Sequence, residues 1–280
     1  MDIRINDQTL DVRLEKEKTI GEVLAALEEW MTNSGHILSG LCVDGEAVKV
    51  SQIEEVFKKE IDSVKCLDIQ TNPVAELMAS SLVTLLEDIK EYESLDFGKK
   101  TDFYGEWKGT ACGRFLEAEI PDLFALCVIT FSNGAMDTAS LASLTEERLR
   151  EITEPVKEFT NIEPVLDEIC LKLVDLPLDI QTGKDKKAAQ TMQLFTALTE
   201  KIFRIYFQID TQGIFIEENT EKKEQIIRQI TEFTDVLKEL LEAYEKNDSV
   251  LVGDLTEYEA SVRIKEIYSA IMENCRRSTQ

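Results

Sequence analysis

The first 70 residues of the chain change their hydrophobic period in a telling order. Apolar and polar residues alternate in "MDIRI" and in "LDVRL", as they do in half-buried strands, and the turn-forming cluster "NDQT" lies between them. This pattern predicts an N-terminal β-hairpin. In the next stretch, "TIGEVLAALEEWM", Thr19 and Glu22 stand at capping-box spacing and mark the start of a helix. The apolar face of that helix consists of Ile20, Val23, Leu24, Leu27 and Met31.

Three more elements complete this region. "HILSGLCVDGEAV" predicts two short strands around Asp44-Gly45, a pair that favours a tight turn. "SQIEEVFKK" predicts a short helix, with Ser51 and Glu54 as a second capping box. "VKCLDIQ" predicts a last strand. The expected order of elements is therefore β-β-α-β-β-α-β.

From Asn72-Pro73 onward the hydrophobic period is helical. A residue before proline avoids helical geometry, and proline suits the first turn of a helix, so this dipeptide predicts a domain boundary. We expect helices over 74–92, over 114–134, two within 143–174 that break near Asn161, one over 184–209, one over 221–246 and a last one through Cys275. Pro121 either kinks the second helix or marks its true start, and Gly134 is its expected stop.

The segment 221–246 has the clearest pattern. Apolar residues recur along it at heptad spacing and predict a buried seam: Ile226, Ile230, Phe233, Leu237, Leu240 and Tyr244. Ile227 and Leu241 are expected to widen this seam. We expect a turn at Gly253 and Asp254, with Asp254 or Thr256 capping the final helix. The predicted fold class is α+β, with a small strand-rich domain at 1–71 and a larger all-α bundle domain at 73–280.

Composition narrows the function. The chain has 280 residues and a formal net charge of −24, which argues against nucleic-acid partners and anionic membrane surfaces. Its longest apolar run is too short for a membrane span, which needs about 20 residues. The N-terminus lacks the pattern of a signal peptide. The six cysteines contain no CxxC pair, so we expect reduced thiols and a cytoplasmic location.

Candidate chemistry is sparse. His36 is the single histidine, so neither a Ser-His-Asp nor a Cys-His arrangement is expected, and a Glu-x-x-His di-metal site is excluded from the helical region. "DFG" at 96–98 lacks the other kinase motifs. "QTGKDKK" at 181–187 lacks the first glycine of a phosphate loop, and is interpreted as a turn at Gly183 with Asp185 as N-cap. We therefore predict no catalytic residue, no metal and no cofactor.

The stretch "DFGKKTDFYGEWKGT" at 96–110 is the remaining candidate. Its glycines and mixed charges predict an ordered loop, and long ordered loops are often functional. The predicted partner-binding residues are Phe103, Tyr104, Trp107, Lys99, Lys100 and Lys108. We expect at least one of the three rings to reach solvent and contact a partner, because aromatic residues dominate interface hot spots. The alternative is that all three rings cover the end of the bundle.

Two resemblances add to this picture. The element order and the "VDGEAV" turn resemble the β-grasp, or ubiquitin-like, fold, which implies a docking surface on the open sheet. Carrier chemistry is not implied, because the last strand continues into "TNPVAELM" without a terminal Gly-Gly. "LPLDIQTGKDKKAAQTMQLFTALTEKIFRI" and "LKELLEAYEKNDSVLVGDLTEYEASVRIKEI" are similar to segments of uncharacterised helical proteins of motile bacteria, clostridia and spirochaetes among them. That similarity implies a bacterial protein with a link to motility.

The resulting functional prediction is a non-enzymatic adaptor or chaperone-like protein that binds a protein partner. The alternative is a small-ligand-binding protein or enzyme, with a pocket where the segment 96–110 meets the helical bundle.

Overall fold

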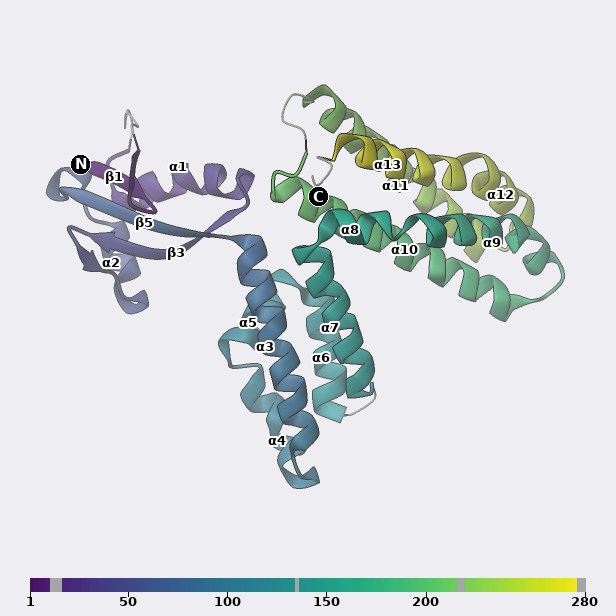
Figure 1. Ribbon diagram of the computed structural model, residues 1–280, viewed down its shortest axis with the longest axis horizontal. Coiled ribbons are helices and arrows are strands. Elements are labelled where there is room, and N and C mark those ends of the chain that lie inside the picture. Colours follow the sequence, from purple (N-terminus) through teal and green to yellow (C-terminus); the bar gives the residue numbers. More distant parts are fainter. Residues whose placement is uncertain (11–16, 134–135, 216–219, 276–280) are drawn as a thin grey trace. The chain divides into compact units, whose positions relative to one another are not determined.

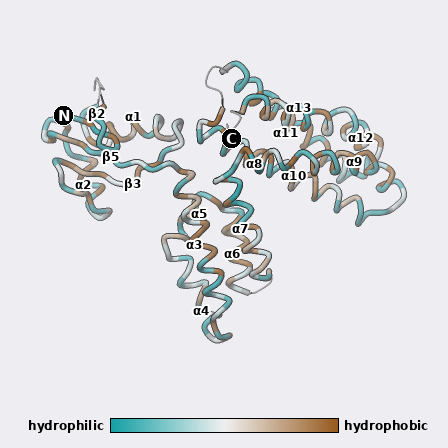
Figure 2. The backbone as a smooth tube through the Cα atoms, viewed as in Figure 1, coloured by the Kyte–Doolittle hydropathy of each residue, from teal (hydrophilic) through white to brown (hydrophobic). Residues whose placement is uncertain are grey.

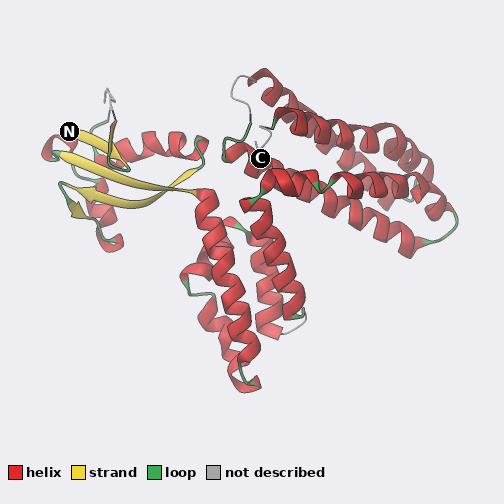
Figure 3. Ribbon diagram, viewed as in Figure 1, coloured by secondary structure: helices red, strands yellow, loops and turns green. Residues whose placement is uncertain are grey.

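The computed structural model describes residues 1–10, 17–133, 136–215 and 220–275. Its contacts divide the chain into two compact units, Met1–Leu149 and Arg150–Gln280. Within the described residues, the strands lie in the N-terminal part of the first unit, and the elements that follow Pro73 are helical (Figures 1 and 3). The predicted α+β class, a small sheet followed by a larger helical region, is confirmed.

The described residues of the N-terminal part form a mixed five-stranded sheet in the order β2-β1-β5-β3-β4. The strands are β1 (Asp2–Ile5), β2 (Gln8–Leu10), β3 (His36–Val43), β4 (Glu46–Ala47) and β5 (Cys66–Pro73). β1 and β5 pair in parallel, and the other pairs are antiparallel. The hairpin is as predicted, but β2 begins at Gln8, and most of the expected strand "LDVRL" lies outside the described residues.

Both tight turns of the sheet use left-handed backbone geometry. Asn6 and Asp7 have φ of 47° and 64°, while Asp44 and Gly45 have φ of 53° and 86°, the pattern of a turn that matches strand twist. The Asp44 carboxylate also accepts hydrogen bonds from the backbone N–H of Lys65 (2.8 Å) and of Cys66 (2.9 Å). These two hydrogen bonds hold the pKa of Asp44 below its usual value and join the turn to the start of β5.

Helix α1 (Ile20–Asn33) has the predicted capping box. The Glu22 N–H donates to Thr19 Oγ1, and the Thr19 N–H donates to the Glu22 carboxylate, each at 3.3 Å. The predicted box of Ser51 and Glu54 is wrong. A 3-10 turn (Val50–Gln52) comes first, and α2 (Ile53–Phe57) starts after Gln52 without a side-chain cap. A second 3-10 turn (Ile61–Ser63) precedes β5.

The strand-rich region has its own hydrophobic core. Ile3, Ile5, Leu41, Val43, Leu67 and Ile69 project from alternate positions of three strands and pack against α1 and α2 through Ile20, Val23, Leu24 and Val56. Because strand side chains alternate between the two faces, Arg4 and Asp68 lie on the opposite face. Their side chains are 3.8 Å apart, and both are partly exposed.

The helices of the first unit follow directly after β5. They are α3 (Val74–Ser94), α4 (Phe97–Trp107), α5 (Ala111–Glu119), α6 (Pro121–Asn133) and α7 (Thr138–Thr153), the last of which continues into the second unit. Of the two interpretations of Pro121, the structure favours a true helix start, since α5 ends before it. Gly134 lies outside the described residues. The predicted boundary at residues 71–73 stays a prediction.

The second unit is a helical bundle. It contains α8 (Pro155–Thr160), α9 (Glu163–Gln181), α10 (Asp185–Thr211), α11 (Thr220–Glu245), α12 (Ser249–Asp254), a π-helical turn (Leu255–Ala260) and α13 (Ser261–Asn274). Hydrophobic and hydrophilic residues alternate along α9, α10 and α11 (Figure 2). The predicted break near Asn161 is confirmed, and Pro155 adds a further start. The predicted helix over 184–209 is confirmed as α10, and apolar residues at spacings of three and four along it are buried: Phe195, Leu198, Ile202, Ile205 and Ile209.

Two details of the α11 prediction are wrong. Ile227 and Leu241 are exposed, so the buried seam is narrower than expected: Phe233 and Leu240 are fully buried, and Ile230 and Leu237 only partly.

The turn after α11 also differs from the expectation. It lies at Asn247 (φ 54°) and Asp248, whose carboxylate caps α12 by accepting from the Leu251 N–H at 3.1 Å. Gly253 is inside α12, where an added Cβ would lie 3.2 Å from Pro177 Cγ. The missing side chain at Gly253 permits a close approach of α12 to α9, so this glycine serves helix packing and not a turn.

Candidate functional site

The segment predicted as an ordered aromatic loop is largely helical. Helix α4 spans Phe97–Trp107 and contains both Gly98 and Gly105. Each glycine costs a helix about 1 kcal/mol relative to alanine, so local propensity disfavours a helix in this segment. The burial of Trp107, with an exposed fraction of 2%, outweighs that cost. Tertiary packing therefore overrides the local signal.

Trp107 is a core residue of the first unit. Its ring stacks on Phe124, with centroids 5.8 Å apart, and meets Phe131 edge-on at 5.0 Å. Its Nε1–H donates to Asp88 Oδ2 at 2.9 Å. Both the apolar ring and its one polar group are thus satisfied inside the unit.

The other predicted contact residues are divided between core and surface. Phe103 is half-buried and packs on Tyr92 and Phe131 at 5.2 and 5.1 Å. Tyr104 is also half-buried, and Lys108 Nζ lies 5.5 Å from its ring centroid. Lys100 Nζ lies 4.9 Å from the Tyr92 centroid, while Lys99 is exposed. The most exposed ring of the helix is Phe97, at 89%.

The turn between α4 and α5 depends on one glycine. A Cβ at Gly113 would lie 2.5 Å from the Trp107 carbonyl oxygen, a distance that real Cβ atoms do not tolerate. Thr110 caps α5 at the same place, because its Oγ1 accepts from the Gly113 N–H at 3.1 Å and donates to the Trp107 carbonyl at 2.7 Å. The sequence "WKGTACG" is therefore explained as a compact helix–helix turn.

Asp88 and two thiols lie beside this ring cluster. Burial raises the pKa of Asp88, although the hydrogen bond from Trp107 opposes the rise. Burial also raises the pKa of Cys112 and of Cys127 to about 12. Both thiols are therefore protonated at neutral pH, which makes them poor nucleophiles.

The remaining motifs have structural explanations. His36 Nδ1 lies 2.9 Å from the Ser34 carbonyl oxygen at the start of β3. In "QTGKDKK", Gly183 forms the turn with φ of 69°, as expected, but the N-cap is Lys184 rather than Asp185. The ammonium groups of Lys184 and Lys187 lie 3.2 and 2.8 Å from the Asp179 carboxylate, whose pKa they lower. Within the described ranges, no three His, Cys, Asp or Glu side chains form a set that could hold a metal ion.

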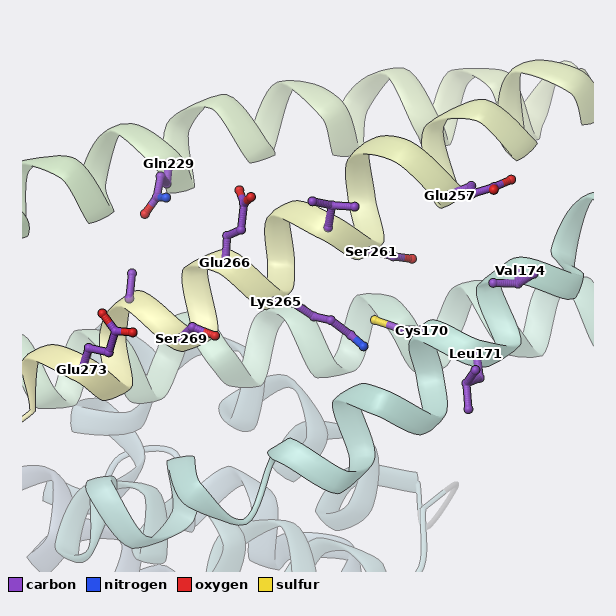
Figure 4. Close-up of a pocket in the computed structure, with 12 residues that line it drawn as sticks. Cys170, Leu171, Val174, Gln229, Glu257, Ser261, Lys265, Glu266, Ser269 and Glu273 are labelled. Carbon is purple, nitrogen blue, oxygen red and sulfur yellow. The ribbon is translucent and has the colours of Figure 1, made fainter.

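A groove in the second unit was not predicted. It has a volume of about 680 Å³ and runs along one face of the π-helical turn and α13, between α9 and α11 (Figure 4). We call it the α9–α13 groove. On the π-helical turn and α13, the lining positions recur three or four residues apart from Glu257 to Glu273, so a whole helical face takes part. A smaller hollow of about 410 Å³ lies between α10 and α11, next to Leu241.

Helix α9 supplies the apolar wall of this groove. Leu171 is 72% exposed and Val174 is 59% exposed, and both line the groove with Cys170. Leu178 continues the same exposed row one turn further on. On α13, Val262 is a third exposed apolar side chain of the lining. Large exposed apolar patches mark interaction sites, so this row makes the groove the candidate binding surface of the second unit.

The charged lining of the groove is mainly acidic. Glu257, Glu266 and Glu273 face a single lysine, Lys265. The charge of Lys265 is already matched, because its Nζ lies 2.6 Å from Asp167 Oδ1. That hydrogen bond raises the pKa of Lys265, so the pair persists at neutral pH. The three glutamate carboxylates therefore give the groove wall a net negative charge.

Two polar features lie within the groove. The side-chain oxygen of Gln229, from α11, is buried and has no hydrogen-bond partner in the part of the chain that the structure describes. The π-helical turn brings Glu257 to one end of the groove, and Thr256 stabilises this turn by donating to the Val252 carbonyl at 2.8 Å. π-Helical turns frequently occur at functional sites.

The sequence contained one usable signal for this groove. The buried row of α9 includes Ile169, Leu173 and Leu176, which satisfies the core. Leu171, Val174 and Leu178 form a second apolar row at spacings of three and four on another side of the same helix. A helix with a second apolar row has one more hydrophobic face than its own bundle needs.

Comparison with known proteins gives two family matches. Residues 1–73 match the TP0873 N-terminal domain, and residues 157–270 match a domain of unknown function (DUF8042). The second match includes most of the α9–α13 groove. The chain is also 22% identical over 273 residues to an uncharacterized protein of Treponema pallidum (strain Nichols), covering 97% of this chain and 96% of that one. No solved structure matches.

Of the helices in the described ranges, none combines the length and the apolar character that crossing a bilayer requires.

Proposed function

We propose that this protein is a non-enzymatic adaptor that binds a partner protein through the α9–α13 groove. The observation that carries the proposal is the pair of exposed side chains Leu171 and Val174 on the wall of a groove of about 680 Å³. Apolar side chains that are left in water on a well-packed bundle gain free energy when a partner covers them, at about 25 cal/mol per Å².

A second proposal concerns the N-terminal sheet, which we propose to be a separate β-grasp module with a docking surface on its open sheet. Its strand order, with the first and last strands parallel at the centre, supports the proposal that residues 1–71 form a β-grasp module. Its core is built from its own side chains. We therefore propose the domain boundary at residues 71–73, and expect residues 1–73, expressed alone, to unfold in one cooperative thermal transition. A fragment without such a transition would contradict this boundary.

Of the predicted partner-binding residues at α4, we keep only the exposed lysines in the proposal. Lys99 and Lys108 are exposed and are proposed to meet an acidic patch of a partner. Trp107 supports that surface indirectly by holding α4 in place. The link to motility implied by the sequence resemblance also stays a proposal. Deleting the gene in a motile host and measuring swarming on soft agar tests it, and unchanged swarming would contradict it.

Site-specific crosslinking tests the adaptor function. A photoreactive amino acid replaces Leu171 in one variant and Ile227, an exposed residue of α11 outside the groove lining, in a control. Both are expressed in the native host and irradiated. We expect a protein adduct of defined mass from position 171 that position 227 does not give. Equal adducts from both positions, or none from 171, would contradict protein binding at the groove.

A further inference from the structure

We infer, on the basis of the proposed adaptor function, that the α9–α13 groove binds a basic amphipathic helix of the partner protein. Three properties of the groove lead to this partner chemistry: its length, its charge and the distribution of its polar groups.

The length of the groove fits a helix. Glu257 and Glu273 lie at its two limits and are 16 positions apart in the chain. At 1.5 Å per residue this corresponds to about 24 Å, the length of a helix of roughly 16 residues. Between these limits Ser261, Ser269 and Ala270 line the groove. Their small side chains leave room for the side chains of a helix packed along α13, because close helix packing needs short side chains on one partner.

The charge of the groove selects the polar face of that helix. Glu266 and Glu273 are exposed on α13, and Glu257 is exposed on the π-helical turn. The one lysine among them is paired with Asp167. A helix with Leu or Ile toward Leu171 and Val174 places its flanking residues near these carboxylates. Lysine or arginine at those flanking positions is attracted, whereas glutamate is repelled.

The same charge argues against a second copy of this chain as the occupant. The chain carries a formal net charge of −24, so two copies repel each other over the Debye length of about 10 Å. The Gln229 side-chain oxygen adds a further preference. Among the described residues this oxygen has no hydrogen-bond partner and is closed to solvent, so a lysine, arginine or amide N–H of the partner helix satisfies it once the Gln229 side chain turns toward the groove.

Two synthetic peptides test the inference on the full-length protein. Both are amphipathic 18-residue helices with the same leucine face; one carries lysine and arginine on its polar face and the other carries glutamate. Their helicity is matched by circular dichroism, and affinities are measured by fluorescence anisotropy at low and high salt. We expect the basic peptide to bind at least about tenfold more tightly than the acidic one, and the difference to shrink as salt screens the charges.

Three protein variants locate the binding. Leu171→Ser with Val174→Ser removes the apolar wall, and we expect binding of the basic peptide to weaken more than tenfold. Glu266→Lys with Glu273→Lys reverses two carboxylates of the groove, and a similar loss is expected. Glu239→Lys with Glu245→Lys makes the same change in net charge on α11, outside the groove lining, and is expected to change the affinity less than threefold.

The possible results separate the two proposals. Equal binding of both peptides that is lost in the Leu171 and Val174 variant would overturn the basic-helix inference and leave the adaptor function intact. Loss of affinity in the Glu239 and Glu245 control as large as in the groove reversal would also overturn the inference. Failure of both peptides to bind would overturn the inference and leave the adaptor proposal to the crosslinking result. A dimer in sedimentation that Leu171→Ser dissociates would identify a second copy as the occupant and overturn the inference.

Discussion

Helix α4 and the α9–α13 groove differ in where they keep their hydrophobic side chains. Trp107 on α4 is 2% exposed, whereas Leu171 on α9 is 72% exposed. The segment of α4 attracts attention in the sequence because of its aromatic residues, yet two of its three predicted contact rings pack on neighbouring rings and Trp107 donates its N–H to Asp88. The groove has ordinary aliphatic residues and no motif. Residue type alone is thus a poor guide to which side chains the fold leaves exposed.

The comparison teaches that a second apolar row on a helix indicates exposed hydrophobic side chains better than residue composition does. An amphipathic helix in a bundle needs one apolar face. Helix α9 has the buried row that includes Leu173 and a second, exposed row that includes Leu171. The second row has no structural task within the bundle. The predictions below test this contrast between buried and exposed residues on the same helices.

Trp107→Ala is expected to have the largest effect. Removing this buried ring leaves a cavity among Phe124, Phe131 and Asp88, and we expect a loss of about 3–5 kcal/mol in the free energy of unfolding. Phe97→Ala on the same helix is the control, because that ring is 89% exposed, and we expect a change within about 0.5 kcal/mol. Urea denaturation measures both. Similar values for the two variants would show that α4 is not held by Trp107.

The second prediction concerns two leucines of α9 that are two positions apart. Leu173 is fully buried, so Leu173→Ala is expected to cost about 2–5 kcal/mol. Leu171→Ala is expected to change stability by no more than about 0.5 kcal/mol, although it removes the same atoms. Thermal or urea unfolding of both variants measures the difference. If Leu171→Ala is as destabilising as Leu173→Ala, the exposed row belongs to the core.

A third prediction tests the narrowed seam of α11. Leu237 is half-buried, so Leu237→Ala is expected to cost about 1–2 kcal/mol, less than the range of about 2–5 kcal/mol for a fully buried leucine. Leu240→Ala is the matched control, because Leu240 is fully buried. The urea concentrations at the unfolding midpoints show which of the two variants is less stable. A larger loss of stability at Leu237 than at Leu240 would mean that the buried face of α11 is centred on Leu237, which contradicts the narrowed seam.

The smallest effect is expected from Asp88→Asn, and it appears in the pH dependence. Burial raises the pKa of Asp88 in the folded state above its unfolded value of about 3.9. The folded state therefore holds this proton more tightly, so the wild-type contribution is present below the unfolded pKa and is lost as pH rises through the folded pKa. Asparagine can still accept from Trp107 but does not titrate. We expect urea midpoints of the wild type to fall relative to the variant as pH rises above the unfolded value of about 3.9, and a constant difference between them would contradict this assignment.

Much of the fold could be predicted because local signals and tertiary packing agree. The order of strands and helices at the N-terminus, the capping box at Thr19 and the turn at Asp44 all follow from short-range patterns that the structure reproduces. The buried stripe of α10 follows from period alone. In each case the residues that form the element are also those that determine its local conformation.

The predictions failed where contacts distant in the sequence decide the outcome. Gly253 looked like a turn residue, but its lack of a side chain serves the contact with Pro177, 76 positions earlier. The helical state of α4 depends on the burial of Trp107 against Phe124 and Phe131. The groove requires knowing which face of α9 and which face of α13 lie together, and neither pattern alone contains that information.

Methyl NMR of the full-length protein tests the central claim most directly. Isoleucine, leucine and valine methyl groups are labelled, and the basic 18-residue peptide is titrated in. The account predicts shifts at Leu171, Val174 and Val262, which are exposed in and around the α9–α13 groove, with no shifts at Leu82 and Leu85 in the core of the first unit. Shifts confined to residues around α4, or no shift at Leu171 at saturating peptide, would contradict it.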